Sequence, residues 1–282
     1  MGRIENINVF QDTMNLCKNN DRIRESVHNS AEGQKLILEG DAIAEPDKKR
    51  YKEKARITVS KKRTFEAALG YQGTKTAVHN FASASNPGGG VERGANAQEE
   101  CLCRCSGLFK CLNASDAWSG FYMVHRAEHN PIHNDDIIYT PDVLVFKSDT
   151  IKPELMDEAD WYEVDVITCA APNLREEPSN AFNTGDGKNA IKITDKDLLA
   201  IHEKRLRRIL DVALSNKVET IVLGAFGCGA FMNNPNVVAQ ASKNVVNEYL
   251  YAFKNIEFAV YCSPKDDTNY RIFDRVLKPY TK

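Results

Sequence analysis

Short apolar runs alternate with amphipathic helical segments through most of this 282-residue chain. Most of these runs are apolar at consecutive positions, which indicates strands that are buried on both faces of a sheet. Buried strands that alternate with helices predict an α/β fold, with a mixed, mostly parallel central sheet between helices. The predicted strands are Ala55–Ser60, Ala77–Ala82, Val143–Phe146, Val164–Ala170, Thr220–Ala225 and Ile256–Cys262.

Three helices of the C-terminal half begin at residues that favour helix N-termini. The first follows a threonine, the second begins with an Asn-Pro pair, and the third follows an aspartate. Such residues satisfy or replace the free N–H groups of the first turn. The three helices are predicted over residues 195–217, 235–253 and 268–277.

The N-terminal part of the chain differs from the rest. Apolar spacing over residues 5–30 predicts one or two amphipathic helices, and the mixed charges of residues 45–50 predict a solvated loop. We therefore expect a single domain overall, in which residues 1–50 form a helical extension packed on a main body of residues 51–282. The polar stretch 172–188, which is rich in Asn, Pro and Gly, predicts a long surface loop.

Charge and composition limit the classes of partner. Lys and Arg total 37 against 39 Asp and Glu, so a formal net charge of -2 provides no general attraction to duplex nucleic acid or an anionic membrane. The N-terminus lacks the apolar run of a signal peptide, and no apolar stretch is long enough to span a bilayer. We expect a soluble, cytoplasmic monomer whose eight cysteines are reduced thiols.

Two groups of cysteine and histidine residues have spacings that could suggest a metal site. The C-x-C-x-C run over residues 101–105 follows a predicted helix start, where residues two apart point about 200° apart and cannot share one ion. His125, His129 and His133 are spaced for one helical face, but Pro131 interrupts that helix. We therefore expect no metal and no cofactor.

Two glycine-rich loops follow predicted strands, at the carboxyl ends where open α/β sheets bind ligands. Residues 86–90 are Asn-Pro-Gly-Gly-Gly, and a helix predicted to begin near Asn96 carries Gln98, Glu99 and Glu100 in its first turn. Residues 224–231 can present backbone N–H groups to a diphosphate. Taken separately, glycines also serve tight turns and acidic residues also favour a helix's first turn, so both loops keep this simpler interpretation.

Together, the sequence N-F-A-S-A-S-N-P-G-G-G (80–90), the Q-E-E triplet (98–100) and G-A-F-G-C-G-A-F (224–231) resemble the compact microbial type of poly(ADP-ribose) glycohydrolase, of the macrodomain superfamily. Seven residues separate the glycine triplet from Q-E-E, within the six to eight that the family's signature has. The resemblance covers most of the chain from about residue 35. It implies a three-layer α/β/α macrodomain-like fold that binds ADP-ribose.

The resemblance also implies roles for individual residues. Glu100 is the expected catalytic acid and Glu99 the expected ligand of ribose hydroxyls. Ser83 stands where many relatives have an asparagine, so that ribose contact is replaced by a hydroxyl or lost. The residues expected to bind substrate are Asn80, Ser83, Gly88, Gly89, Gly90, Val91, Gln98, Gly227, Cys228, Gly229, Ala230 and Phe231.

The implied activity is hydrolysis of the ribose-ribose O-glycosidic bond of poly(ADP-ribose), with ADP-ribose as the product. Glycosidases usually place two carboxylates across the scissile bond. Glu99 and Glu100 are neighbours whose side chains diverge by about 100° on a helix, so we expect Glu100 to work alone. A hydrolase of mono-ADP-ribosyl groups on protein or nucleic acid and a non-catalytic ADP-ribose-binding macrodomain remain as alternatives.

Overall fold

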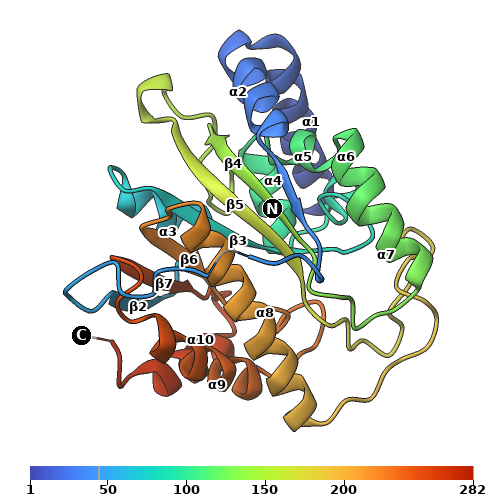
Figure 1. The fold of residues 1–282 in the computed structure, drawn as a ribbon. Helices are drawn as coiled ribbons and strands as arrows, with labels where there is room; N and C mark the ends of the chain where they lie inside the picture. The colour runs from blue at the N-terminus through green and yellow to red at the C-terminus, as the bar shows by residue number, and fades with distance from the viewer. Residues whose placement is uncertain (44, 282) are drawn as a thin grey trace.

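A seven-stranded sheet forms the centre of the computed structural model, which describes residues 1–43 and 45–281 (Figure 1). Its strand order is β1-β4-β5-β3-β6-β7-β2. β4 is antiparallel to both of its neighbours, and the strands from β5 to β2 are parallel, so the predicted mixed, mostly parallel sheet is confirmed. The strands are β1 (Lys35–Ile37), β2 (Arg56–Ser60), β3 (Thr76–Ala82), β4 (Ile137–Val145), β5 (Tyr162–Ala170), β6 (Thr220–Leu223) and β7 (Asn255–Ala259).

Helices cover both faces of the sheet (Figure 1). One face carries α8 (Asp195–Ser215), α9 (Pro235–Val246) and α10 (Thr268–Leu277). The other carries α1 (Arg3–Asn19), α2 (Asp21–Glu32), α3 (Thr64–Ala68), α4 (Gln98–Cys105), α5 (Leu108–Leu112), α6 (Ser115–Ala117) and α7 (Met123–Glu128). Short 3₁₀ turns lie at Leu69–Tyr71, Val91–Arg93, Glu158–Asp160 and Asn247–Tyr249, and a π-helical turn at Trp118–Tyr122.

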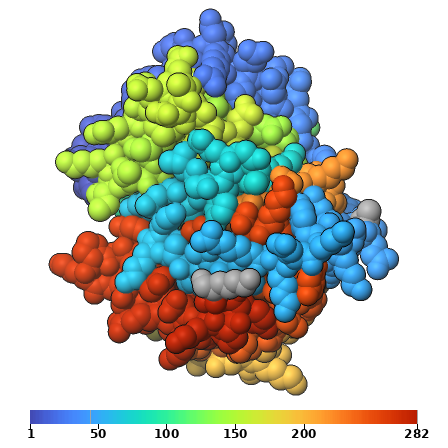
Figure 2. All heavy atoms as spheres, turned by 90° about the vertical axis from the view of Figure 1, so that its left-hand side faces the viewer, coloured from blue at the N-terminus to red at the C-terminus, as the bar shows by residue number. Residues whose placement is uncertain are grey.

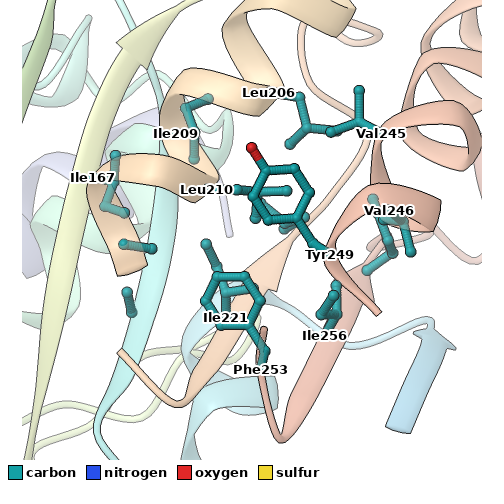
Figure 3. Close-up of a cluster of buried hydrophobic side chains, with 14 of the residues drawn as sticks. Ile167, Leu206, Ile209, Leu210, Ile221, Val245, Val246, Tyr249, Phe253 and Ile256 are labelled. Carbon is teal, nitrogen blue, oxygen red and sulfur yellow. The ribbon is translucent and has the colours of Figure 1, made fainter. Parts of the chain in front are cut away.

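The larger core lies between α8, α9 and the sheet (Figure 3). Ile209 and Leu210 of α8 face Ile221 of β6 and Ile256 of β7, and all four are fully buried. Tyr249 fills the space between the two helices and donates its hydroxyl to Asp211 at 2.6 Å. Burying each aliphatic side chain contributes about 1.5–3 kcal/mol, so this face anchors the sheet that carries the loops described below.

The N-terminal segment is tied to the body at several points. Phe10 of α1 packs edge-to-face on Phe109 with ring centroids 4.9 Å apart, and the Thr13 hydroxyl donates to the carbonyl of Arg104 at 2.6 Å. β1 pairs antiparallel with β4, with Ile37 opposite Ile137. Residues 1–50 therefore supply one strand of the sheet in addition to helices, and the domain boundary at residue 50 stays a prediction.

Several predicted element boundaries were wrong. β1 was missed because it has only three residues, one of them a lysine. β4 begins before the predicted Val143 because Pro141 and Asp142, with φ of 50° at Asp142, form an irregularity that interrupts its apolar pattern. β7 ends at Ala259, so that Val260 to Cys262 belong to a loop, and the helix predicted over 235–253 ends at Val246.

The loop over residues 172–188 has many exposed residues, as predicted for a long surface loop, and it is also held to the body by buried contacts. Asp186 is 2% exposed and accepts hydrogen bonds from Ser85 at 2.9 Å and Asn173 at 2.7 Å. The ring of His133 lies 3.4 Å from the same carboxylate. The sequence of this loop does not reveal which of its polar residues are buried, because a buried polar residue is distinguished from an exposed one only by its hydrogen-bond partners.

The opposite edge of the sheet is formed by β2. Figure 2 shows this side, where β2 and α3 (blue to cyan) lie between C-terminal residues (red) and the segment that joins β4 to β5 (yellow-green). Phe65 of α3 is fully buried, and its carbonyl accepts from the Tyr162 hydroxyl at 2.8 Å. This contact ties α3 to the first residue of β5.

All eight cysteines are free thiols; Cys103 and Cys105 of α4 are buried in the core, and Cys101 is 8% exposed outside that cluster. α7 ends at Glu128, and His129 continues with φ of 50°. His125 instead contacts the carbonyl of Phe121 at 2.8 Å. Within residues 1–43 and 45–281, no grouping of three His, Cys, Asp or Glu side chains is suited to a metal, and no helix there is long and apolar enough to cross a membrane.

Candidate active site

The two glycine-rich loops meet above the carboxyl ends of β3 and β6, which are neighbours in the sheet. Between the loops lies a cavity of about 310 Å³, the first cavity. It brings together predicted site residues that are far apart in the chain. Those that line it are Ser83, Gly89, Gln98, Glu99, Glu100, Gly227, Gly229, Ala230 and Phe231.

Two of the three glycines of the first loop have different reasons to be glycine. Gly88 and Gly89 have φ of 65° and 60°, which L-residues rarely adopt. A Cβ on Gly88 would lie 2.7 Å from Phe109, and one on Gly89 would lie 2.5 Å from a carboxylate oxygen of Glu100. Gly88 therefore faces the core, whereas Gly89 allows the Glu100 carboxylate to approach the backbone. Val91, also expected at the ligand, is fully buried and lines neither this cavity nor the one beside it.

Glu100 is held by two backbone N–H groups. Gly90 N donates to Oε1 at 2.9 Å, and Ala97 N donates to Oε2 at 2.8 Å. The second contact is half of a capping box, in which the third helical residue reaches back to the residue before the helix. The carboxyl is 7% exposed and lines the first cavity. A carboxyl with this fixed position can act on a ligand atom that the cavity brings close.

Glu99 points toward β3. Ser83 N donates to its Oε2 at 2.8 Å, and Asn80 Nδ2 donates to Oε1 at 3.3 Å. Burial, reinforced by the nearby charge of Glu100, raises the pKa of Glu99 to about 8. Asn80, predicted as a ligand contact, is fully buried and lines neither this cavity nor the one beside it, so its contact at the site is with Glu99.

Gln98 completes the edge of β3. β6 pairs with β3 only as far as Val78, so the backbone groups of the next residues that point toward β6 have no strand to pair with, although β5 continues on the other side. The Gln98 side chain accepts from Phe81 N at 2.9 Å and donates to the carbonyl of His79 at 2.8 Å, as a neighbouring strand would. It also donates to the Thr64 hydroxyl at 3.0 Å. Gln98 was predicted as a ligand contact, and in the structure its amide is engaged by the protein.

The second loop keeps N–H groups available. Gly227 has φ of 75°, and a Cβ there would lie 2.7 Å from Ala171. In the described residues, the N–H groups of Gly229, Ala230 and Phe231 have no protein acceptor. Consecutive free N–H groups at the wall of a cavity form a site for an anion. The thiol of Cys228 points to the carbonyl of Phe226 at 3.7 Å and lies outside the cavity wall.

The two aromatic residues of this loop lie in different surroundings. Phe226 is 6% exposed and packs on His79, with ring centroids 4.4 Å apart, so it belongs to the core. Phe231 is only partly buried and lines the first cavity. Its ring is therefore available to a ligand.

Sequence reasoning missed the support beneath Glu100. Arg104 of α4 is 1% exposed and donates to the carbonyl of Ala95 at 2.7 Å and to Asn96 Oδ1 at 2.5 Å. These contacts fix the residues just before α4. The C-x-C-x-C run around Arg104 gave no signal for this role, because a buried arginine is uncommon and its partners are in the preceding loop.

It also missed the far end of the cavity. Tyr261, which is 44% exposed, lines the cavity beside Arg63, whose guanidinium lies 4.0 Å from the ring centroid. Arg63 is 3.9 Å from the buried carboxylate of Asp149, which holds the cation in place. Asn269 lies on the same wall. This part of the wall offers a partly exposed aromatic surface from the loop after β7, whereas the two acids come from α4.

Comparison with known proteins identifies the family of the chain. The family profile "Microbial-type PARG, catalytic domain" matches residues 5–148. The poly(ADP-ribose) glycohydrolase of Deinococcus radiodurans, solved in complex with ADP-ribose, is 30% identical, with 90% of this chain and 97% of that chain covered and a TM-score of 0.75. The chain belongs to the microbial-type poly(ADP-ribose) glycohydrolase family.

Other structures of this family extend the match. The poly(ADP-ribose) glycohydrolase of Thermomonospora curvata is 28% identical, with 97% of this chain and 100% of that chain covered and a TM-score of 0.81. The same enzyme bound to the inhibitor ADP-HPD is matched with 26% identity, 97% and 99% coverage and a TM-score of 0.79. A comparison with curated proteins gave no match. The macrodomain-like α/β fold and the poly(ADP-ribose) glycohydrolase family predicted from the sequence are confirmed.

Proposed function

We propose that this protein hydrolyses the ribose-ribose O-glycosidic bond of poly(ADP-ribose) and releases ADP-ribose. Membership of a family of poly(ADP-ribose) glycohydrolases supports the reaction. The observation that carries the assignment to this chain is the position of Glu100, whose carboxyl is fixed by Gly90 and Ala97 at the wall of the first cavity.

The ligand is oriented by the two ends of the cavity. The free N–H groups of Gly229, Ala230 and Phe231 receive the diphosphate, because they present a row of donors to an anion. Tyr261 provides an aromatic surface for the adenine at the far end. The distal ribose then lies between Phe231 and the two acids.

Glu99 binds rather than reacts. Its raised pKa leaves a proton on the carboxyl near neutral pH, so that it can donate a hydrogen bond to a ribose hydroxyl as well as accept one. Ser83 and Asn80 keep it against β3, away from the position of Glu100. The two neighbouring acids thus serve different parts of one sugar.

Glu100 supplies the proton chemistry. The protonated carboxyl donates its proton to the ribose oxygen of the leaving unit as the bond from that oxygen to the anomeric carbon breaks. The electron pair of that bond stays on the leaving oxygen, and an oxocarbenium-like sugar remains. The carboxylate then accepts a proton from water as the water oxygen bonds to the anomeric carbon. The diphosphate held nearby stabilises the intermediate positive charge.

The test is direct. Purified protein is incubated with poly(ADP-ribose) and, separately, with a mono-ADP-ribosylated peptide, and free ADP-ribose is resolved. We expect release from the polymer, and we expect Glu100→Gln to lower turnover by about 10²-fold or more with ADP-ribose affinity changed by less than a few-fold. Glu92→Gln, an exposed neighbour outside the cavity, is the matched control.

Each other outcome has a defined meaning. Release from the mono-ADP-ribosylated peptide in place of the polymer would make the protein a mono-ADP-ribosyl hydrolase. Binding without release from either substrate would make it a reader of ADP-ribose. Full turnover by Glu100→Gln would remove Glu100 from the mechanism.

A monomeric, cytoplasmic enzyme is part of the proposal. The eight free thiols support a reducing compartment, since cysteines in oxidising compartments commonly pair. The near balance of charge supports a substrate held by local contacts instead of a general positive surface.

A further inference from the structure

A second, more open cavity of about 830 Å³ adjoins the first and also has Glu100 in its wall. It shares part of its wall with the first cavity, including Ser83, Gly89 and Glu100. A substrate whose scissile bond lies at Glu100 therefore has its ADP-ribose unit in the first cavity and its leaving group in the second. What the second cavity recognises decides which leaving group the enzyme accepts.

Three arginines from separate parts of the chain line the second cavity. They are Arg3 of α1, Arg93 of the 3₁₀ turn before α4, and Arg175 of the loop after β5. None of the three has a carboxylate within ion-pair distance among residues 1–43 and 45–281. Glu100 is the acidic residue of this wall. Unpaired guanidinium groups around an open cavity favour a phosphate-bearing ligand.

Hydrogen bonds to the protein position two of the three arginines, Arg3 and Arg175. Arg3 Nε donates to the carbonyl of Arg93 at 2.7 Å, which ties α1 to the catalytic loop. Arg175 donates to Asn173 Oδ1 at 2.9 Å, and its guanidinium lies 5.7 Å from the ring centroid of Phe231. Fixed cations lose little conformational entropy when a ligand binds.

An aromatic side chain completes the cavity. Phe182 is 63% exposed, and the guanidinium carbon of Arg93 lies 4.8 Å from the centroid of its ring. A large apolar ring left exposed at the mouth of a cationic cavity, rather than buried, is a suitable platform for a nucleobase. The cavity thus offers cations and a stacking surface within one site.

We propose that the second cavity binds the next nucleotide unit of the polymer, the one that leaves. In poly(ADP-ribose) the leaving oxygen is a hydroxyl of an adenosine ribose, which carries both an adenine and a diphosphate. Arg3, Arg93 and Arg175 receive the diphosphate, and Phe182 stacks on the adenine. A modified amino-acid side chain offers neither group. This inference rests on the proposed function, and it assigns recognition of the leaving unit to the side chains that line the second cavity.

Two defined substrates test it. One is a dimer of ADP-ribose, and the other is ADP-ribose joined by the same bond to a ribose that lacks base and phosphate. We expect a value of kcat/KM at least about 10-fold higher for the dimer, since charged hydrogen bonds and base stacking each contribute on that scale. Arg93→Gln and Phe182→Ala should each lower the value for the dimer by about 10-fold and leave that for the truncated substrate unchanged. Lys152→Gln, exposed and remote from both cavities, is the control.

A binding measurement separates this inference from the proposed function. With the Glu100→Gln protein, the dimer should bind more tightly than ADP-ribose, with a steeper loss of affinity as salt rises. Adding Arg93→Gln should remove that excess. If the enzyme cleaves both substrates equally, and the dimer binds no tighter than ADP-ribose, the second cavity is no nucleotide subsite. If neither substrate is cleaved, the proposed function fails, and the binding comparison still decides the inference.

Discussion

The amide of Gly90 donates a hydrogen bond of 2.9 Å to the Glu100 carboxylate, across the turn that separates the glycine triplet from α4. The loop and the helix therefore hold one another, and the acid is fixed from both sides. The glycine triplet serves the carboxylate at least as much as it serves a ligand. The free N–H groups that suit a diphosphate belong to the other loop.

Replacing Gly89 with alanine should disturb Glu100 directly. The added Cβ would lie 2.5 Å from Oε1 of Glu100, at a φ of 60° that alanine tolerates poorly. We expect turnover of poly(ADP-ribose) to fall by about 10²-fold, because a misplacement near 1 Å has that effect. Steady-state kinetics measure this. Gly70→Ala, where the nearest atom is 4.0 Å away, should retain activity, and an active Gly89→Ala would contradict the packing described.

Gln98→Leu should destabilise the fold while preserving side-chain volume. The change leaves Phe81 N and the carbonyl of His79 without partners in a buried setting. Two orphaned backbone groups cost about 2–4 kcal/mol in the free energy of unfolding. Urea denaturation measures it. Gln240→Leu, on the exposed side of α9, should change the same quantity by less than about 0.5 kcal/mol.

Glu99 should make stability depend on pH. Burial raises its pKa from 4.5 to about 8, so between these values the folded protein holds a proton that the unfolded chain releases. This group's stabilising contribution is complete below pH 4.5 and is lost as pH rises through 8. Glu99→Gln removes the titration.

The free energy of unfolding of Glu99→Gln, minus that of the unchanged protein, should therefore rise from pH 4.5 to 8. Urea titrations at several pH values across and beyond this range measure the difference. A difference that stays constant with pH would show that Glu99 ionises alike in both states.

Tyr261→Ala should weaken ADP-ribose binding more than it slows chemistry. The ring is 44% exposed and lines the first cavity, and it takes no part in the hydrogen bonds that fix Glu100. Loss of a stacked base costs about 1–3 kcal/mol, so the dissociation constant should rise by about 10-fold with kcat changed little. Calorimetry and kinetics distinguish the two effects. Tyr251→Ala is the control, because Tyr251 is also partly exposed but lies outside both cavities. If Tyr261→Ala bound ADP-ribose with unchanged affinity, the adenine would not stack on Tyr261.

Local patterns predicted the fold class, most strands and the two loops, because each depends on neighbours in the chain. The apolar run of β3 and the glycines after it are adjacent, and so are Gln98, Glu99 and Glu100. Once β3 and β6 are parallel neighbours, their loops must meet. This is why the first cavity was predictable.

The remaining features depend on contacts between distant residues. Arg3 reaches the carbonyl of Arg93, and Tyr261 was assigned to a strand although it lies in a loop over Arg63. Gln98 was predicted to contact the ligand, whereas its partners are backbone groups of β3. Those groups are free only because β6 stops pairing with β3 at Val78, and the sequence gives no sign of where that pairing ends. No periodicity in the sequence indicates these contacts between distant residues.

β2 pairs with β7, so a strand from the beginning of the main body finds its partner near the end of the chain. During synthesis, residues 56–60 leave the ribosome long before residues 255–259 exist. The β2–β7 pair therefore forms late, and until then the sheet that supports both glycine-rich loops is incomplete. Long-range pairing of this kind slows folding and leaves apolar strands exposed meanwhile. We expect the nascent chain to depend on chaperones until its last strand is made.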